Sequence, residues 1–231
     1  FDKANRTSGS SYRSLGLDRG LRILGEVKNK FELRTTTDVH ESIQVIPASE
    51  FVDVLQIPAF LCRQTDLLVA CGKTGLAVNI KKGQFMSPED MEFAVAKVRN
   101  AQQDLALKNN SIYVTERGTT FGYNNLVVDF RSLPIIRRFA PCIFDVTHST
   151  QRPGALGGSS GGDRIWAPYL ARAAAAVGVD GFFIETHPDP KSALSDGPLM
   201  IPLDNLESLI RELIQVSLLK RTFPNEGGLP S

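Results

Sequence analysis

The feature that most constrains the fold is a regular alternation between short, β-branched apolar runs and longer stretches with helical periodicity. We expect strands at residues 33–39, 52–57, 76–80, 111–115, 142–146 and 181–185. We expect helices at residues 17–31, 63–75, 87–100, 125–139, 164–178 and 203–223. Because strand and helix alternate along the chain, the sequence predicts an α/β protein with a parallel sheet.

Two architectures fit this alternation, an open doubly wound sheet and a (β/α)₈ TIM barrel. Every expected strand runs directly into a polar tail, such as "TDVHE" after the first and "ETHPDP" after the last. A site built from the ends of so many strands is typical of a barrel, whereas a doubly wound sheet gathers its ligands at one switch point. We therefore predict a single barrel domain over residues 1–231, N-terminally incomplete, with the first strand and most of the second upstream of Phe1.

The bulk properties exclude several classes of protein. A length of 231 residues with 42% hydrophobic residues suits one large core, and a net charge of +1 excludes the basic field of a nucleic-acid binder. No window approaches the roughly 18 apolar residues of a membrane span. Cys62, Cys71 and Cys142 are odd in number and irregularly spaced, which favours buried thiols in a reducing compartment. We expect a cytoplasmic protein without membrane or nucleic-acid partners.

The three histidines, His40, His148 and His187, all follow expected strands. His148 together with Glu185 and Asp196 can form an open metal site of mixed nitrogen and oxygen ligands, with positions left for water or substrate. The alternative is a hydrogen-bonded polar cluster at the mouth of the barrel. The residues alone leave both interpretations open.

Cationic residues form a second set at the strand ends. Arginine grips phosphate and carboxylate groups in a bidentate fork and lysine binds them as a point charge. Five of these residues are expected to converge on an anion: Lys3, Arg6, Arg63, Lys81 and Arg117. For Lys82 we expect a solvated loop charge. The glycine-rich segment 152–164 lacks the spacing and the lysine of a P-loop, and we interpret it as a mobile lid.

Several motifs in order resemble one enzyme family. They are "FDKANRTS", "TDVHES", "QIPAFLCRQTDLL", "NIKKGQF", "TERGTTFGYNNLVVDFRS", "FDVTHS", "SGGDR", "ETHPDP" and "SDGP", and they extend from Phe1 to about Leu218. The chain resembles 3-deoxy-D-manno-octulosonate 8-phosphate synthase (KDO8P synthase). The resemblance implies a (β/α)₈ barrel, usually a homotetramer without an organic cofactor, that condenses phosphoenolpyruvate with D-arabinose 5-phosphate and water for lipopolysaccharide assembly.

The resemblance also implies a role for individual residues. Phosphoenolpyruvate would be bound by Lys81, Arg117 and Gln56. The arabinose phosphate would be held by Lys3, Asn5, Arg6 and Ser8, with Arg63 reaching across a subunit boundary. Asp38 and His40 would line the same pocket, and the implied catalytic residues are Lys81, Asp38, His40 and Asn5.

The family divides into metal-dependent and metal-independent members. His148, Glu185 and Asp196 match three of the metal ligands, and the fourth, a cysteine or an asparagine, belongs to a first strand that this sequence does not contain. The residues in the motifs "TERGTTFGYNN" and "LSDG" favour the metal-dependent group, so we expect a divalent ion such as Zn, Fe, Mn or Cd.

Three other functions remain open at the level of sequence. A related aldolase would join phosphoenolpyruvate to another sugar phosphate, such as erythrose 4-phosphate. A Schiff-base aldolase would use Lys81 as its nucleophile. A non-catalytic sugar-phosphate binder would keep the fold without the chemistry.

Overall fold

The computed structural model describes residues 1–4, 8–9, 11–104, 111–120, 123–152 and 161–219. Its centre is a six-stranded parallel sheet in the order β1-β2-β3-β4-β5-β8. The strands are β1 (Thr36–Asp38), β2 (Val54–Ile57), β3 (Ala77–Lys81), β4 (Ile112–Glu116), β5 (Cys142–Asp145) and β8 (Gly181–Phe183). All six expected strands are therefore confirmed, each within a few residues of its expected ends.

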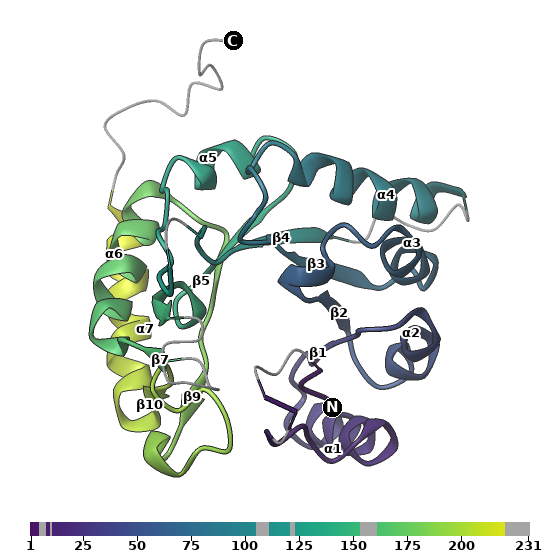
Figure 1. The fold of residues 1–231 in the computed structure, drawn as a ribbon, viewed down its shortest axis with the longest axis horizontal. Helices are drawn as coiled ribbons and strands as arrows, with labels where there is room; N and C mark the ends of the chain where they lie inside the picture. The colour runs from purple at the N-terminus through teal and green to yellow at the C-terminus, as the bar shows by residue number, and fades with distance from the viewer. Residues whose placement is uncertain (5–7, 10, 105–110, 121–122, 153–160, 220–231) are drawn as a thin grey trace.

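The order of the strands decides between the two architectures. Neighbours in the sheet follow one another along the chain without a reversal, and the helices lie on the outer side of a strongly curved sheet (Figure 1). A doubly wound sheet reverses its strand order and carries helices on both faces. The described sheet is thus a half-barrel, consistent with the predicted (β/α)₈ barrel.

Seven α-helices are described outside the sheet: α1 (Leu17–Phe31), α2 (Ser42–Ser49), α3 (Thr65–Lys73), α4 (Met91–Asp104), α5 (Ser132–Ile136), α6 (Ala167–Val177) and α7 (Leu203–Leu218). Their apolar faces pack on the buried side chains of the strands in one core that includes Leu55, Ile80 and Phe144. None of these helices has the length and the apolar run that crossing a bilayer requires.

Two short two-stranded sheets, one antiparallel and one parallel, flank the ends of the central strands. β6 (Gln151–Arg152) pairs with β7 (Gly161–Gly162), which closes the base of the predicted lid, while residues 153–160 of that lid lie outside the described residues. β9 (Thr186–His187) pairs with β10 (Ile201–Pro202) and follows β8. The 3₁₀ helices are η1 (Ala59–Leu61), η2 (His148–Thr150), η3 (Arg164–Trp166) and η4 (Pro190–Ser192).

The helix predicted at 125–139 is wrong over most of its length. Only α5 is helical, because Thr119 and Val127 exchange two backbone hydrogen bonds of 2.8 Å and hold the preceding segment extended against the tail of β4. Gly118, with φ of 94°, allows the chain to turn there. The local run "LVVDF" is rich in β-branched residues, which suit an extended chain as well as a helix.

Helix α2 was not among the expected elements. It is only eight residues long and contains Pro47, which normally argues against a helix. Its start is fixed by a capping box in which Glu41 and Gln44 each accept a backbone N–H from the other's position. The pair Glu41 and Gln44, spaced by three residues, was the signal in the sequence.

Candidate active site at the carboxyl ends of the strands

Lys81, the last residue of β3, lies at the centre of a buried polar cluster. The residue is 7% exposed, and its Nζ donates to Asp145 Oδ2 at 2.9 Å. The same Nζ is 3.4 Å from His148 Nδ1 and 3.8 Å from the centre of the Phe183 ring. Lys81 therefore lies buried at the carboxyl end of β3, among the side chains that follow the neighbouring strands.

Asp145, at the end of β5, joins this lysine to His148. Its carboxylate accepts the backbone N–H of His148 at 2.9 Å and lies 2.8 Å from His148 Nδ1. Burial alone would raise the pKa of Asp145, but the charges of His148, Lys81 and Arg117 together hold the pKa well below its usual range. Asp145 thus supplies a fixed negative charge. It was not among the predicted site residues, although it stands in the quoted motif "FDVTHS".

His148, Glu185 and Asp196 come together as the sequence predicted. One ligand atom from each lies within 4.8 Å of the others, and His148 Nε2 is 3.6 Å from Glu185 Oε1. His148 Nδ1 lies 2.8 Å from Asp145 Oδ2, and this contact orients the ring so that Nε2 faces Glu185.

This cluster fits a divalent cation. Glu185 Oε2 is buried and has no hydrogen-bond partner among the described residues, so a carboxylate oxygen is available at the centre of the group. The donor set of one imidazole and two carboxylates suits a transition metal. Lys3 Nζ lies 2.8 Å from Asp196 Oδ2 and 3.8 Å from Glu185 Oε1, which adds a positive charge to the two carboxylates.

Arg117 follows β4 and brings a second cation to the same end of the sheet. The residue is 8% exposed, and one terminal nitrogen donates to Gln151 Oε1 at 2.7 Å and to the carbonyl of His148 at 3.4 Å. Its Nε is buried without a partner among the described residues. Burial lowers the pKa of Arg117, and Asp145 is the largest opposing influence. Arg117 therefore keeps donors available for an anion. The sequence carried no signal for Gln151.

Asp38 and Gln56 take part in a ladder of side-chain hydrogen bonds across four strands. Thr115 Oγ1 donates to Asn79 Oδ1 at 2.7 Å, and Asn79 Nδ2 donates to Gln56 Oε1 at 2.8 Å. Gln56 Nε2 then donates to Asp38 Oδ1. Asn79 was not predicted, but it stands two residues before Lys81 in a strand, a spacing that places both side chains on one face.

His40 lies beside the ring of Phe1, edge to face, with 6.3 Å between ring centres. Its backbone N–H donates to Gln44 Oε1 at 2.9 Å, and its Nδ1 is buried without a hydrogen-bond partner in the described part of the chain. Burial lowers the pKa of His40, against the influence of Asp38 and Asp2. The third histidine, His187, accepts the backbone N–H of Asp189 at 3.0 Å in a turn.

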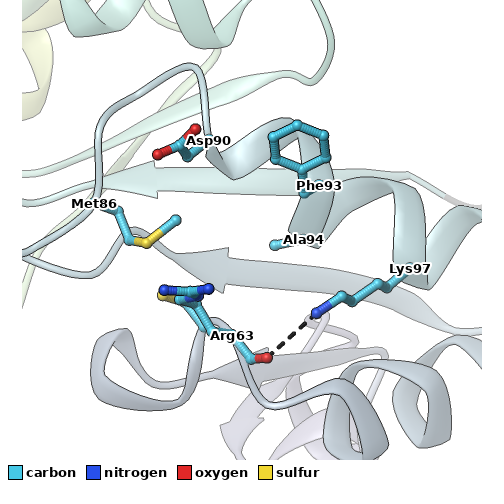
Figure 2. Close-up of a pocket in the computed structure, with 7 residues that line it drawn as sticks. Arg63, Met86, Asp90, Phe93, Ala94 and Lys97 are labelled. Atoms are coloured by element: carbon cyan, nitrogen blue, oxygen red, sulfur yellow. Dashed lines mark hydrogen bonds between the residues drawn. The ribbon is translucent and has the colours of Figure 1, made fainter.

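Arg63 is exposed and lines a different cavity. This cavity has a volume of about 290 Å³ and lies between the segment after η1 and helix α4 (Figure 2). Lys97 Nζ donates to the carbonyl of Arg63 at 3.4 Å and to Thr65 Oγ1 at 2.8 Å. The lining residues are Cys62, Arg63, Met86, Asp90, Phe93, Ala94 and Lys97. The chain's own Arg63 is thus separate from the cluster around Lys81.

The remaining predicted sugar-phosphate residues divide into two groups. Asn5 and Arg6 lie outside the described residues, whereas Lys3 and Ser8 are described and half-buried. The prediction that Lys82 is a solvated charge is wrong, because its side chain is 0% exposed. The chain turns back after Gly83, and this turn presents carbonyl groups to the ammonium of Lys82 instead of water.

Comparison with known proteins agrees with this geometry. Residues 1–220 match the DAHP synthetase I family. The "2-dehydro-3-deoxyphosphooctonate aldolase" of Helicobacter hepaticus is 58% identical over 221 residues, which cover 94% of this chain and 82% of the relative. The protein of the same name from Campylobacter jejuni strain RM1221 is 57% identical with the same coverage, and that of Helicobacter pylori strain P12 is 55% identical over 94% of this chain and 81% of its own.

A six-stranded parallel half-barrel, the cationic strand ends and these identities all point to one group of proteins. The chain belongs to the DAHP synthetase I family and, within it, to the 2-dehydro-3-deoxyphosphooctonate aldolases, which are also called KDO8P synthases.

Proposed function

We propose that this protein condenses phosphoenolpyruvate with D-arabinose 5-phosphate and water to give 3-deoxy-D-manno-octulosonate 8-phosphate and inorganic phosphate, a product used in lipopolysaccharide assembly. It is an enzyme that forms a carbon–carbon bond. The observation that carries the proposal is the pair of buried cations, Lys81 and Arg117, beside His148 and its carboxylates at the carboxyl ends of the strands.

Phosphoenolpyruvate is a trianion near neutral pH, so its C3 can approach an aldehyde only when this charge is neutralised. In the proposed site, Lys81 binds phosphoenolpyruvate, Arg117 binds its phosphate and Gln56 lies beside it. Both cations are more than nine-tenths buried, and a cation that is removed from water attracts an anion more strongly. The hydrogen bonds from these cations to Asp145 and Gln151 fix their side chains before substrate arrives.

The pentose phosphate would be held by Lys3, Asn5, Arg6 and Ser8. Asp38 and His40 would line the same pocket. The position of Lys3 next to Asp196 supports this assignment, because it places the sugar site against the proposed metal ligands. The reacting aldehyde would then lie between the two groups of residues.

The reaction needs no covalent enzyme intermediate. C3 of phosphoenolpyruvate bonds to the aldehyde carbon while the oxygen of water adds at C2. One proton of the water goes to the aldehyde oxygen. The C2–O bond to phosphate then breaks, the new hydroxyl becomes the C2 ketone, and its proton leaves with the inorganic phosphate. A Schiff-base route is less suitable for this site, because Lys81 Nζ is held 2.9 Å from the buried carboxylate of Asp145, which keeps it from attacking a carbonyl.

A divalent metal, such as Zn, Fe, Mn or Cd, would be held by His148, Glu185 and Asp196. When bound, such an ion would act as a Lewis acid that orients the aldehyde or the attacking water. Asp145 would contribute by fixing the ring of His148, as carboxylates commonly do for metal-binding histidines.

We also place the enzyme in a homo-oligomer, a tetramer by its family resemblance, in the cytoplasm. Arg63 and Phe93 line the same cavity, and Phe60, Phe85 and Phe93, in nearby segments of the chain, are 58%, 59% and 70% exposed. Such a surface suits contact with a second copy, in which Arg63 would reach the partner's sugar phosphate. The three cysteines are free and buried, as expected for a reducing compartment.

The deciding experiment measures phosphate release from phosphoenolpyruvate with and without D-arabinose 5-phosphate. Release that requires the pentose phosphate supports the proposal. Release with erythrose 4-phosphate instead would assign the protein to the related aldolases, and trapping of a substrate by borohydride would establish a Schiff base. Binding of both ligands without release of phosphate would identify a non-catalytic binder.

The oligomer has its own test. A Lys81→Ala subunit lacks the cation for phosphoenolpyruvate but keeps Arg63, whereas an Arg63→Ala subunit has the opposite defect. Mixing the two variants should restore part of the activity if Arg63 acts across a boundary. Activity that remains the simple average of the separate variants would contradict that arrangement.

A further inference from the structure

Lys82 and Glu116 form a fully buried ion pair directly behind the two cations of the proposed site. Both side chains are 0% exposed, and Lys82 Nζ lies 3.6 Å from Glu116 Oε2. Lys82 is the residue after Lys81, and Glu116 is the residue before Arg117. Each member of the pair is therefore the direct chain neighbour of one cation of the site.

Lys82 ties the tail of β3 to the tail of β4. Its Nζ donates to the carbonyl of Met86 at 3.2 Å, to the carbonyl of Gly83 at 3.4 Å and to Thr119 Oγ1 at 3.4 Å. The first two acceptors belong to the turn after β3, and the third belongs to the segment after β4. One ammonium group thus joins these two segments.

Glu116 fixes the other side of the link. Its Oε1 accepts the backbone N–H of Gly118 at 2.7 Å, across the left-handed turn that carries Arg117. Burial raises the pKa of Glu116, and the charge of Lys82 opposes this rise. The carboxylate is therefore held by the backbone N–H of the residue after Arg117 and by the lysine after Lys81.

Backbone hydrogen bonds carry the link into the strand ends. Lys82 N–H donates to the carbonyl of Thr115 at 2.8 Å, and Thr120 N–H donates to the carbonyl of Gln84 at 3.2 Å. Because side chains alternate along an extended chain, Lys81 and Arg117 point to one side while Lys82 and Glu116 point to the other. A change in the pair would therefore alter the positions of both cations.

A buried ion pair adds little to the stability of a core, since apolar residues of similar size often give equal or greater stability. Stability therefore does not account for this pair, whereas a role in placing the neighbouring cations does. We propose that Lys82 and Glu116 are positioning residues, which set the separation and the aim of Lys81 and Arg117 on phosphoenolpyruvate. This inference rests on the proposed function.

The experiment compares steady-state kinetics of the full chain with those of the double variant Lys82→Met/Glu116→Gln. The double variant has no charge at these two positions, keeps an oxygen for Gly118 and loses the donor that joins the two tails. We expect it to unfold within a few degrees of the unmodified protein, while the KM for phosphoenolpyruvate rises about tenfold. The KM for D-arabinose 5-phosphate should stay unchanged, because Lys3 and Ser8 belong to another part of the chain.

Two further variants keep the test decisive. Thr119→Val removes one acceptor of Lys82 without burying a charge, and it should raise the same KM about threefold. Arg137→Met breaks a pair with Asp180, which links Arg137 to the amino end of β8 through bonds of 3.0 Å. This control should lower thermal stability and leave both KM values unchanged.

The outcomes separate the two proposals. A double variant and a Thr119→Val variant with an unchanged KM for phosphoenolpyruvate would overturn the positioning role, as would a double variant in which both KM values rise equally. If the double variant does not fold, Thr119→Val alone decides the question. An unmodified protein that releases no phosphate would instead overturn the proposed function.

Discussion

Lys81 Nζ lies 2.9 Å from Asp145 Oδ2, although the two residues are 64 positions apart and stand on strands that are not neighbours in the sheet. The bond crosses over β4 at the carboxyl ends of the strands. It combines a cation with a carboxylate that also lies 2.8 Å from Nδ1 of His148. The arrangement couples the proposed phosphoenolpyruvate residue to the proposed metal ligand.

Replacing Asp145 with Asn should therefore weaken both the proposed binding of phosphoenolpyruvate through Lys81 and the proposed binding of metal through His148. The amide cannot balance the charge of Lys81 or fix the ring of His148 in the same way, so we expect kcat/KM to fall about 100-fold. Steady-state kinetics and metal content would be measured together. Asp180→Asn is the matched control, because Asp180 lies near the opposite ends of β5 and β8 and should leave both quantities unchanged.

Lys81→Ala and Arg117→Ala should each abolish turnover without unfolding the protein. Each removes a buried cation that would neutralise phosphoenolpyruvate, and we expect losses of about 1,000-fold or more in kcat/KM. Phosphate release and circular dichroism would be measured side by side. Arg131→Ala, which removes an exposed arginine paired with Asp129 in the same turn, serves as the control. Near-normal activity in either site variant would refute the assignment.

His148→Ala should remove bound metal from the purified enzyme. The variant loses the only imidazole of the group formed with Glu185 and Asp196. Metal content by atomic emission would be compared with that of His187→Ala, whose ring accepts a backbone N–H in a turn and lies outside this group. Equal metal content in the two variants would contradict the assignment of His148. Chelation should also stop phosphate release if the reaction depends on the metal.

His40 should make stability depend on pH. Its pKa is lowered in the folded state by burial, so the unfolded state binds more protons below the ordinary histidine value of about 6.5. Stability should therefore be complete above that value and fall as the pH falls from it toward the folded pKa. In His40→Gln the free energy of unfolding, from urea titrations at pH 7.5 and 5.5, should fall less. An equal fall would exclude this role.

Asn79→Leu should destabilise the fold through the hydrogen-bond ladder. The change leaves the buried partners Gln56 and Thr115 without their amide, which costs about 1–3 kcal/mol. Urea denaturation would give the loss, and Asn100→Leu on the exposed side of α4 would be the control. A rise in the KM for phosphoenolpyruvate should accompany the loss, because Gln56 is released. Unchanged stability would show that the ladder contributes little.

The sequence was sufficient for the sheet because each strand is a short apolar run with a clear end. Leu55, Ile80 and Phe144 are buried where the pattern predicts. It was insufficient for segment 125–131, since Val127 and Val128 fit a helical spacing equally well. The extended form there depends on a partner, Thr119, that is close only after folding.

The same distinction applies to the candidate site. Lys81, Arg117 and the trio of His148, Glu185 and Asp196 could be predicted because chemistry and position at strand ends coincide. Asp145 and Gln151 were missed because their importance lies in what they contact. Lys82 was misjudged for the same reason: nothing in the local sequence reveals that Glu116 and the carbonyl of Met86 will surround it.

The ladder from Thr115 through Asn79 and Gln56 to Asp38 also affects the entropy of substrate binding. Asn79 uses both its donor and its acceptor within the ladder, so it and Gln56 have little freedom to change rotamer. Their order is established when the chain folds and need not be created when a ligand arrives. Differences in heat capacity between the free and the liganded enzyme should accordingly come from other parts of the chain, since the ladder is already hydrogen-bonded without a ligand.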